Sequence, residues 1–298
     1  MVEANTGEVP VTSFDSIIPT GWLTAYGRTF TDIPYSQEMF DELEAIRIAS
    51  GSTETLDVMK DTKLAPQFEA RHKLLNGLIA QTGIKQVIEI AAGLSTRGLE
   101  MTSNDSVDYV EVDLPAMVAD KRKIITDLEN KGAIPKRPNL YIEAGSATEA
   151  DDLLKATSHF NSSEPIVVVN EGLLRYLGFE DKTKYADNVK ALLMKFGGVW
   201  ITSDISLPKI IYKENDVMAD RRKRISEITG VNVADNLFKD EDDAKKFFEG
   251  LGFDVESHSF LEVTNELTAP AKLNMPTDYV EAINGSAVVF VMRLNSKV

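Results

Sequence analysis

The sequence predicts an α/β protein built on a seven-stranded, mostly parallel sheet, with helices on both faces and an antiparallel last strand. Two observations lead to this fold class. From residue 85 onward, short runs rich in Val and Ile recur between Gly, Pro, Asn and Asp, and segments with helical spacing separate the first five runs. Strands that alternate with helices join by right-handed crossovers, which makes the sheet parallel. The strand runs are 85–91, 108–113, 139–144, 165–171, 198–205, 253–260 and 286–294.

The connections between these runs differ along the chain. Residues 116–132 and 182–198 have helical spacing, and the second segment ends in Gly-Gly, a typical helix stop. The stretch between the last two strand runs contains proline and shows little helical period. We therefore expect the last two strands to form an antiparallel pair at one edge of the sheet.

We expect residues 1–298 to form a single domain that carries two additions to the sheet. Residues 1–84 precede the first strand and are predicted to be a mainly helical N-terminal cap region, with helical spacing at 37–49 and 67–81. Residues 206–234 form a long connection of a kind that is usually functional or mobile. We interpret this connection as an inserted lid over the substrate.

The composition excludes several classes of function. The formal net charge of −15 argues against a nucleic-acid partner, because phosphate backbones require an excess of Lys and Arg. The absence of cysteine excludes disulfides, thiolate metal sites and cysteine nucleophiles, and with only three histidines no metal site is expected. The N-terminal residues lack an apolar signal segment, and no run approaches the ~20 apolar residues of a membrane span. We expect a cytoplasmic protein without a membrane partner.

Candidate binding residues lie where the strand runs end, because ligands of an open parallel sheet bind outside the carboxyl ends of its strands. The first run ends in Ala91-Ala92-Gly93, a small-residue turn that a ligand can approach closely. The second run ends at Asp113, where an acid can accept both hydroxyls of a ribose. The alternative is that Asp113 caps the helix that begins at Pro115. Turn and acid together favour a nucleoside ligand.

The third and fourth runs add further candidates. Gly145-Ser146-Ala147 can flank a flat adenine, although an ordinary turn has the same pattern. The fourth run ends in Glu171, whose carboxylate can pair with a cationic ligand. The alternative is a structural ion pair between Glu171 and Arg175 at (i, i+4). We favour a ligand for Glu171, because it shares the mouth of the cleft with Asp113.

Together these segments resemble the class I S-adenosylmethionine (SAM)-dependent methyltransferases, which have a Rossmann-like fold. More specifically, they resemble the leucine carboxyl methyltransferase family, which includes polyketide O-methyltransferases of the tetracenomycin type. The resemblance covers about residues 20–205, and its specificity comes from three segments in order rather than from any one of them. These are 86–98 (QVIEIAAGLSTRG), 111–115 (EVDLP) and 171–177 (EGLLRYL), with looser matches at 68–71 and 24–28.

The resemblance implies SAM as the cofactor and a small molecule as the methyl acceptor. Arg71 would pair with the SAM carboxylate, the Gly93 turn would lie under the methionine part, and Asp113 would hold the ribose. Glu171 would lie near the methionine amino group or the sulfonium, and Glu89 is expected to orient the Gly93 loop or Arg71. Ser146 and Ala147 would flank the adenine at a position where family members often carry an acid. The implied cofactor-binding residues are Arg71, Glu89, Ala91, Gly93, Asp113, Ser146, Ala147 and Glu171.

The implied reaction is an in-line transfer of the sulfonium methyl group to a carboxylate or hydroxyl oxygen. Glu171, Arg175 and Tyr176 are candidates for positioning the reactants, and no residue is assigned as a general base. Arg28 or Arg175 would contact an acceptor carboxylate. Two alternatives stay open at this point: a non-catalytic SAM-binding protein and a Rossmann-fold NAD-dependent dehydrogenase. The missing third glycine of the dinucleotide fingerprint counts against the dehydrogenase.

Overall fold

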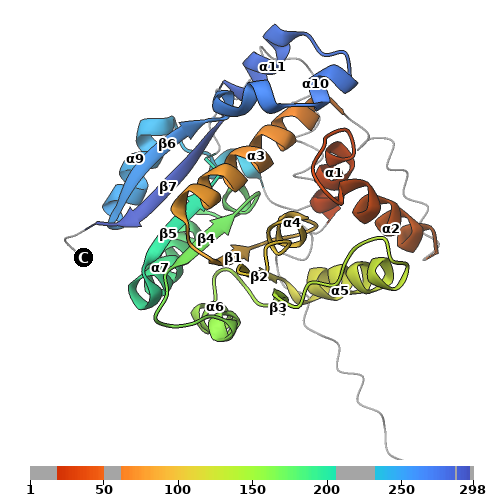
Figure 1. The fold of residues 1–298 in the computed structure, drawn as a ribbon. Coiled ribbons are helices and arrows are strands. Elements are labelled where there is room, and N and C mark those ends of the chain that lie inside the picture. The colour runs from red at the N-terminus through yellow and green to blue at the C-terminus, as the bar shows by residue number, and fades with distance from the viewer. Residues whose placement is uncertain (1–18, 50–61, 206–231, 286, 296–298) are drawn as a thin grey trace, which may run out of the picture.

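The computed structural model describes residues 19–49, 62–205, 232–285 and 287–295. They form a twisted open sheet with helices on both faces, which confirms the predicted fold class (Figure 1). Each predicted strand run contains one strand. The strands are β1 (Gln86–Ile90), β2 (Asp108–Asp113), β3 (Leu140–Ala144), β4 (Ile166–Asn170), β5 (Gly198–Thr202), β6 (Phe253–Ser259) and β7 (Val288–Leu294).

The strand order creates a crevice in the middle of the sheet. The order is β3-β2-β1-β4-β5-β7-β6, and β1 pairs in parallel with both β2 and β4. The chain therefore adds strands on one side of β1 and then crosses to its other side. At such a switch point the connections leave in opposite directions and open a crevice at the carboxyl ends of the strands.

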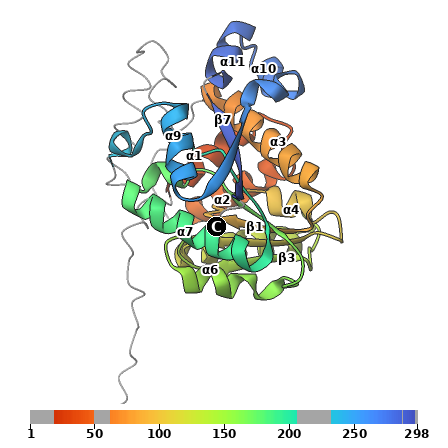
Figure 2. The same cartoon turned by 90° about the vertical axis from the view of Figure 1, so that its left-hand side faces the viewer.

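The two faces of the sheet are covered by different helices because the side chains of each strand alternate in direction. Val87 contributes to a core with α3 (Ala65–Thr82), whereas Ile88 and Ile90 point to the opposite face. That opposite face is covered by α6 (Ala150–Ala156), α7 (Phe179–Phe196) and α9 (Glu241–Gly250), as Figures 1 and 2 show.

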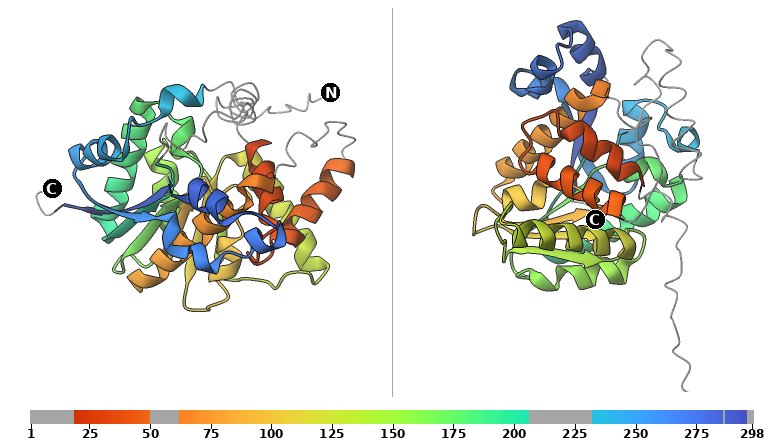
Figure 3. Two further views of the ribbon diagram at one scale, coloured as in Figure 1. Left: turned by 90° about the horizontal axis from the view of Figure 1, so that it is seen from above. Right: turned by 90° about the vertical axis from the view of Figure 1, so that its right-hand side faces the viewer.

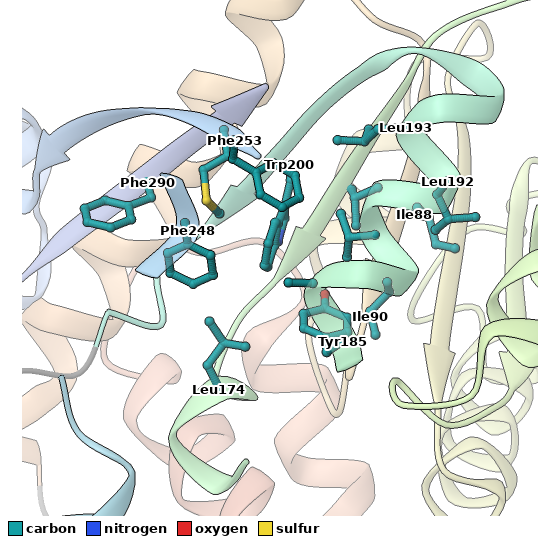
Figure 4. Packing of buried hydrophobic residues seen from close by; sticks show 14 of the residues in the cluster. Ile88, Ile90, Leu174, Tyr185, Leu192, Leu193, Trp200, Phe248, Phe253 and Phe290 are labelled. Carbon is teal, nitrogen blue, oxygen red and sulfur yellow. The ribbon is translucent and has the colours of Figure 1, made fainter. Parts of the chain in front are cut away.

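The largest core cluster is centred on Trp200 of β5, which is fully buried. The rings of Tyr185, Phe248 and Phe253 pack edge-on around its indole, with centroids 5.3–5.4 Å away (Figure 4). The indole N–H donates to the side-chain oxygen of Asn170 at 2.7 Å, so the one polar group of Trp200 is satisfied. This cluster anchors the carboxyl ends of β4 and β5 beside the crevice.

The N-terminal helices lie beside the same crevice. α1 (Pro19–Arg28) and α2 (Ser36–Ala49) pack on α5 (Pro115–Asn130) through an apolar cluster that includes Ala25, Met39 and Met117 (Figures 1 and 3). Their helical character agrees with the prediction for the described part of residues 1–84. The 3-10 helix η3 (Thr62–Leu64) then leads into α3.

The last two strands form the predicted antiparallel pair at one edge of the sheet: β7 pairs with β5, and β6 is the edge strand. The connection between β6 and β7 differs from the prediction, because it is helical whereas little helical period was expected. Its elements are too short to show a period: η7 (Phe260–Glu266), α10 (Ala269–Lys272) and α11 (Thr277–Asn284). Most of the predicted lid, residues 206–231, lies outside the described residues, and the described chain resumes at the 3-10 helix η6 (Val233–Asn236).

Candidate functional site

A cavity of about 220 Å³ lies over the carboxyl ends of β1 to β4, at the switch point of the sheet. Side chains from α1 and α3 form its other walls. Every residue that the sequence analysis singled out for cofactor binding or positioning lines this cavity. They are Arg71, Glu89, Ala91, Gly93, Asp113, Ser146, Ala147, Glu171, Arg175 and Tyr176.

The turn after β1 contains two residues in the left-handed backbone region, and both are small. Ala91 and Gly93 both have positive φ, at 57° and 51°, and the Ala91 N–H donates to the Val112 carbonyl at 2.8 Å. No heavy atom lies within 4 Å of the place where a Cβ on Gly93 would stand. The glycine therefore leaves open space against the cavity, where a ligand can approach the backbone.

Asp113 links this turn to the end of β2. Its Oδ2 accepts the Gly93 N–H at 2.6 Å and its Oδ1 accepts the Leu114 N–H at 2.8 Å. Leu114, not Asp113, is the N-cap of α5, so the helix-cap alternative is wrong. Burial raises the pKa of Asp113, and the two backbone N–H donors oppose this effect. Each carboxylate oxygen has spare acceptor capacity toward the cavity.

Glu171 stands at the centre of a cluster of arginines. Its Oε1 pairs with Arg28 at 2.5 Å and with Arg71 at 2.7 Å, and its Oε2 pairs with Arg97 at 2.7 Å. Burial alone would raise the pKa of Glu171, but the charges of Arg71, Arg28 and Arg97 outweigh burial and hold the pKa well below its usual value. The alternative pairing of Glu171 with Arg175 is therefore wrong.

The arginines that line the cavity keep unused donors. Among the described residues, the Nε groups of Arg28, Arg71 and Arg175 are buried without a hydrogen-bond acceptor. A buried guanidinium with an unpaired N–H has a free-energy deficit that an anionic ligand group removes. The residues present thus fit the carboxylate of an amino-acid moiety at this end of the cavity.

Glu89 lines the cavity but does not make the contacts expected of it, and its part in cofactor binding stays a prediction. It accepts from Arg97 Nη1 and, at 2.8 Å, from the hydroxyl of Tyr109, rather than contacting Arg71 or the Gly93 loop. Arg97 also donates through Nε to Asn76 at 2.7 Å and is fully buried. Period-two alternation places Glu89 on the α3 face of β1, which is where the α4 helix (Arg97–Met101) presents Arg97.

The end of β3 forms the far wall. The Ser146 N–H donates to Asp152 Oδ2 at 2.9 Å, and the Ser146 hydroxyl lies 3.0 Å from that of Thr148. Ser146 and Ala147 line the cavity beside Asp113, as an adenine pocket next to a ribose site requires. Their role in adenine binding stays a prediction.

Sequence reasoning missed three buried charges that organise the site. Arg97 lies inside the quoted first motif, but its partners Glu89 and Glu171 are distant in sequence. Asp204 follows β5, and Lys182 lies on α7; both are about 1% exposed. The available signal was a charged residue within an otherwise apolar pattern, which sequence alone does not distinguish from a surface residue. The histidines do not converge, and no metal-binding group of His, Cys, Asp or Glu occurs within the described ranges.

A family model for leucine carboxyl methyltransferase matches residues 34–190, more than half of the chain. The chain belongs to the leucine carboxyl methyltransferase family. The match contains β1, β2, β3 and β4 with the turn, the acids and Arg71, Arg97 and Glu171. The assignment agrees with the resemblance seen in the three sequence segments.

Curated relatives in mycobacteria share part of the chain. A putative S-adenosyl-L-methionine-dependent methyltransferase of Mycolicibacterium paratuberculosis is 26% identical over 208 residues, which cover 69% of this chain and 64% of that protein. A similarly named protein of Mycolicibacterium smegmatis is 26% identical over 135 residues, 45% of this chain and 44% of its own length. The alignments thus span about half to two thirds of these relatives.

Solved structures align more loosely. The methyltransferase domain of bacterial CtHen1-C aligns with a TM-score of 0.49 and 14% identity, covering 76% of this chain and 98% of that chain. Magnesium protoporphyrin IX methyltransferase from Synechocystis with bound SAH aligns with a TM-score of 0.47 and 11% identity, over 86% and 94% of the two chains. Since both scores lie below 0.5, the family assignment rests on the match over residues 34–190. No helix in the described part of the chain is long and apolar enough to span a membrane.

Proposed function

We propose that this protein is a SAM-dependent O-methyltransferase that methylates a carboxylate of a small, polyketide-like molecule. The observation that carries the proposal is the polarity of one cavity. An acid that can hold a ribose, Asp113, lies at one part of its wall, and the Arg28–Arg71–Glu171 cluster lies at another. The Gly93 turn lines the same cavity, where the methionine part of SAM would lie over it.

The cluster is suited to a zwitterion. The Nε groups of Arg28 and Arg71 are free to donate to the methionine carboxylate of SAM. Arg97 holds Glu171 Oε2 from inside the protein, which keeps Oε1 directed toward the cavity. Oε1 then accepts from the methionine ammonium group when Arg28 or Arg71 turns to the carboxylate. Ion pairs within the protein are thus replaced by ion pairs between protein and SAM, and no ion is left unpaired.

The other end of SAM meets fixed acceptors. Asp113 is held by the Gly93 and Leu114 N–H groups, so its carboxylate is already oriented before a ribose binds. Ser146 and Ala147 supply the small side chains between which adenine fits. A preorganised site spends less binding free energy on ordering its side chains.

The charge balance favours an anionic acceptor. The site contains more arginines than acids, and SAM adds a sulfonium cation. The arginines are Arg28, Arg71, Arg97 and Arg175, and the acids are Glu89, Asp113 and Glu171. Because a carboxylate is ionised at neutral pH, it needs no general base to become a nucleophile. SAM supplies an activated methyl group, and the chain positions the acceptor oxygen and excludes water. Arg175, whose Nε is unpaired, is the proposed contact for the acceptor.

Calorimetric titration with SAM, S-adenosylhomocysteine and NAD tests the cofactor. We expect the first two to bind and NAD not to bind. Asp113→Ala and Arg71→Ala should each weaken SAM binding at least about tenfold without unfolding the chain, because each removes a charge-assisted contact. Asp254→Ala, at an exposed position on the edge strand β6, is the control and should bind SAM normally. Retained affinity in both site variants contradicts the site assignment.

A panel of aliphatic and aromatic acids, with the matching phenols and alcohols, tests the acceptor. Methyl esters formed from radiolabelled SAM support the proposal. Turnover of hydroxyl compounds alone would replace the carboxylate with a hydroxyl acceptor. Tight SAM binding without turnover of either class favours a non-catalytic SAM-binding protein.

A further inference from the structure

The segment that follows Glu171, residues 172–177, forms part of the cavity wall. One buried acid holds the start of this wall segment. Asp204, just beyond β5, accepts the N–H groups of Gly172 at 2.5 Å, Leu173 at 2.6 Å and Leu174 at 3.1 Å. Asn170 donates to the same carboxylate at 2.8 Å. Leu174 continues into the core cluster (Figure 4). The first half of this cavity wall is therefore rigidly attached to the sheet.

The end of the same segment is fixed by a buried cation. Lys182 Nζ donates to the Leu177 carbonyl at 2.6 Å, and its side chain is about 1% exposed. The ammonium group lies 4.6 Å from the ring centroid of Phe179 and 5.6 Å from that of Phe238. In the described part of the chain no carboxylate forms an ion pair with Lys182, and Asp204 is the acid whose charge it senses. A buried lysine without an ion-pair partner is costly, so its contacts call for an explanation.

Those contacts join the wall to the returning chain. Lys182 Nζ also donates to the Asn236 carbonyl at 2.8 Å, and Asn236 Nδ2 donates to the Arg175 carbonyl at 3.1 Å. Asn236 ends η6, the first described element after residues 206–231. Lys182 and Asn236 thus bind η6 to the part of the wall that carries Arg175, Tyr176 and Leu177.

We propose that Lys182 is a positioning residue for acceptor binding, which sets the place of residues 175–177 in the cavity wall and ties them to η6. The inference rests on the proposed function for its acceptor. Lys182 is not among the residues that line the cavity, so it acts through Arg175 and its neighbours rather than by touching a ligand. Asp204 accepts hydrogen bonds from the N–H groups at one end of the wall segment, and Lys182 donates a hydrogen bond to a carbonyl at the other end.

The two hydrogen bonds of Lys182 do not require it to be charged. Burial lowers the pKa of Lys182 to about 8, with the charge of Asp204 opposing the effect. A neutral amine still has two N–H groups, which match the two carbonyl acceptors, Leu177 and Asn236. The link between the wall and η6 therefore persists across the neutral pH range.

Hydrogen exchange on the whole chain tests the link without any acceptor. Lys182→Met keeps the length of the stem and removes the donor. We expect faster exchange at the Tyr176 and Leu177 amides and in residues 232–238, with unchanged exchange in β1 and β2. Asn236→Ala, a milder change, should loosen the same two regions. Lys184→Met is the control, since Lys184 lies on the same helix, is 53% exposed and pairs with Glu149. Unchanged exchange at both regions in Lys182→Met and in Asn236→Ala overturns the proposal.

Kinetics then separate positioning from general damage. With an acceptor identified, Lys182→Met should raise the KM for the acceptor by roughly tenfold or more, while calorimetry gives an unchanged SAM affinity. A loss of SAM affinity as large as the rise in acceptor KM contradicts a role confined to the acceptor wall. If wild-type protein binds no SAM, the proposed function fails, whereas the exchange result still decides whether the link exists.

Discussion

Arg97 and Glu171 form an ion pair of 2.7 Å inside the protein, with no exposed surface on the Arg97 side chain. Through Nη1 the same guanidinium also binds Glu89, and through Nε it binds Asn76. It thereby connects α3, β1 and the end of β4, three elements that form the base of the cavity. One of the two carboxylate oxygens of Glu171 is thus held by a residue that does not line the cavity.

Replacing Arg97 should lower the free energy of unfolding more than replacing an exposed arginine. Arg97→Met leaves the buried Glu89 carboxylate without its arginine and removes one of the three arginines that pair with Glu171, and breaking a buried ion pair costs about 3–5 kcal/mol. We expect a loss of that order in the free energy of unfolding, measured by urea denaturation. Arg122→Met is the matched control, because Arg122 is 56% exposed and lies 3.8 Å from its partner Glu143. Equal stabilities of the two variants would contradict the role given to Arg97.

Gly98 should tolerate no side chain, although it is helical. A Cβ there would stand 2.6 Å from Glu111 Oε1 and 2.7 Å from Leu140 Cδ1. Gly98→Ala should therefore lower the free energy of unfolding by about 1–3 kcal/mol through overpacking. Gly77→Ala, on exposed α3 surface with no atom within 4 Å, should instead stabilise the protein by about 0.5–1 kcal/mol. Calorimetric melting of both variants checks the opposite signs.

Gly93 should matter for binding more than for stability. Its φ of 51° makes Gly93→Ala cost about 1–2 kcal/mol of folding free energy. The added methyl group also enters the space against the cavity, so SAM affinity should fall at least about tenfold. Gly132→Ala has a similar backbone cost at φ 69° outside the cavity and should leave SAM affinity unchanged. Comparing melting temperature with calorimetric affinity in both variants separates the two effects.

Glu111 should make the stability of the protein depend on pH. Burial raises its pKa to about 7, although Lys121, 2.5 Å away, opposes the shift. Between about pH 4.5, its unfolded value, and pH 7, the folded state binds more protons than the unfolded state. The stability that Glu111 contributes below pH 4.5 is therefore lost as pH rises through 7.

Glu111→Gln should remove this dependence. Measured by urea denaturation, the stability of the variant relative to wild type should increase from pH 5 to pH 8, by on the order of 1–3 kcal/mol. The pH effects of groups that do not interact with Glu111 cancel in this difference. Glu249→Gln, at an exposed position of α9, should show no such change. A difference that is constant with pH would contradict the raised pKa.

Much of the fold and of the site could be predicted from the sequence. Runs of β-branched residues predicted where each strand lies along the chain, because strand formation follows the local side-chain pattern. Asp113, Gly93 and Glu171 were predicted to meet, because parallel strands bring their carboxyl ends to one edge. The helices after β6 were missed because segments of four and eight residues carry too little period.

The sequence by itself determined the strand count, the small turn after β1 and the acids at the strand ends, since these depend on local pattern and on the general geometry of parallel sheets. Only the tertiary structure decided which charges pair. Glu89 binds Arg97 and Tyr109, and Glu171 forms ion pairs with three arginines. Lys182 of α7 donates a hydrogen bond to the Asn236 carbonyl. Ion pairing depends on distance in space and on burial, and neither is encoded in the spacing of residues along the chain.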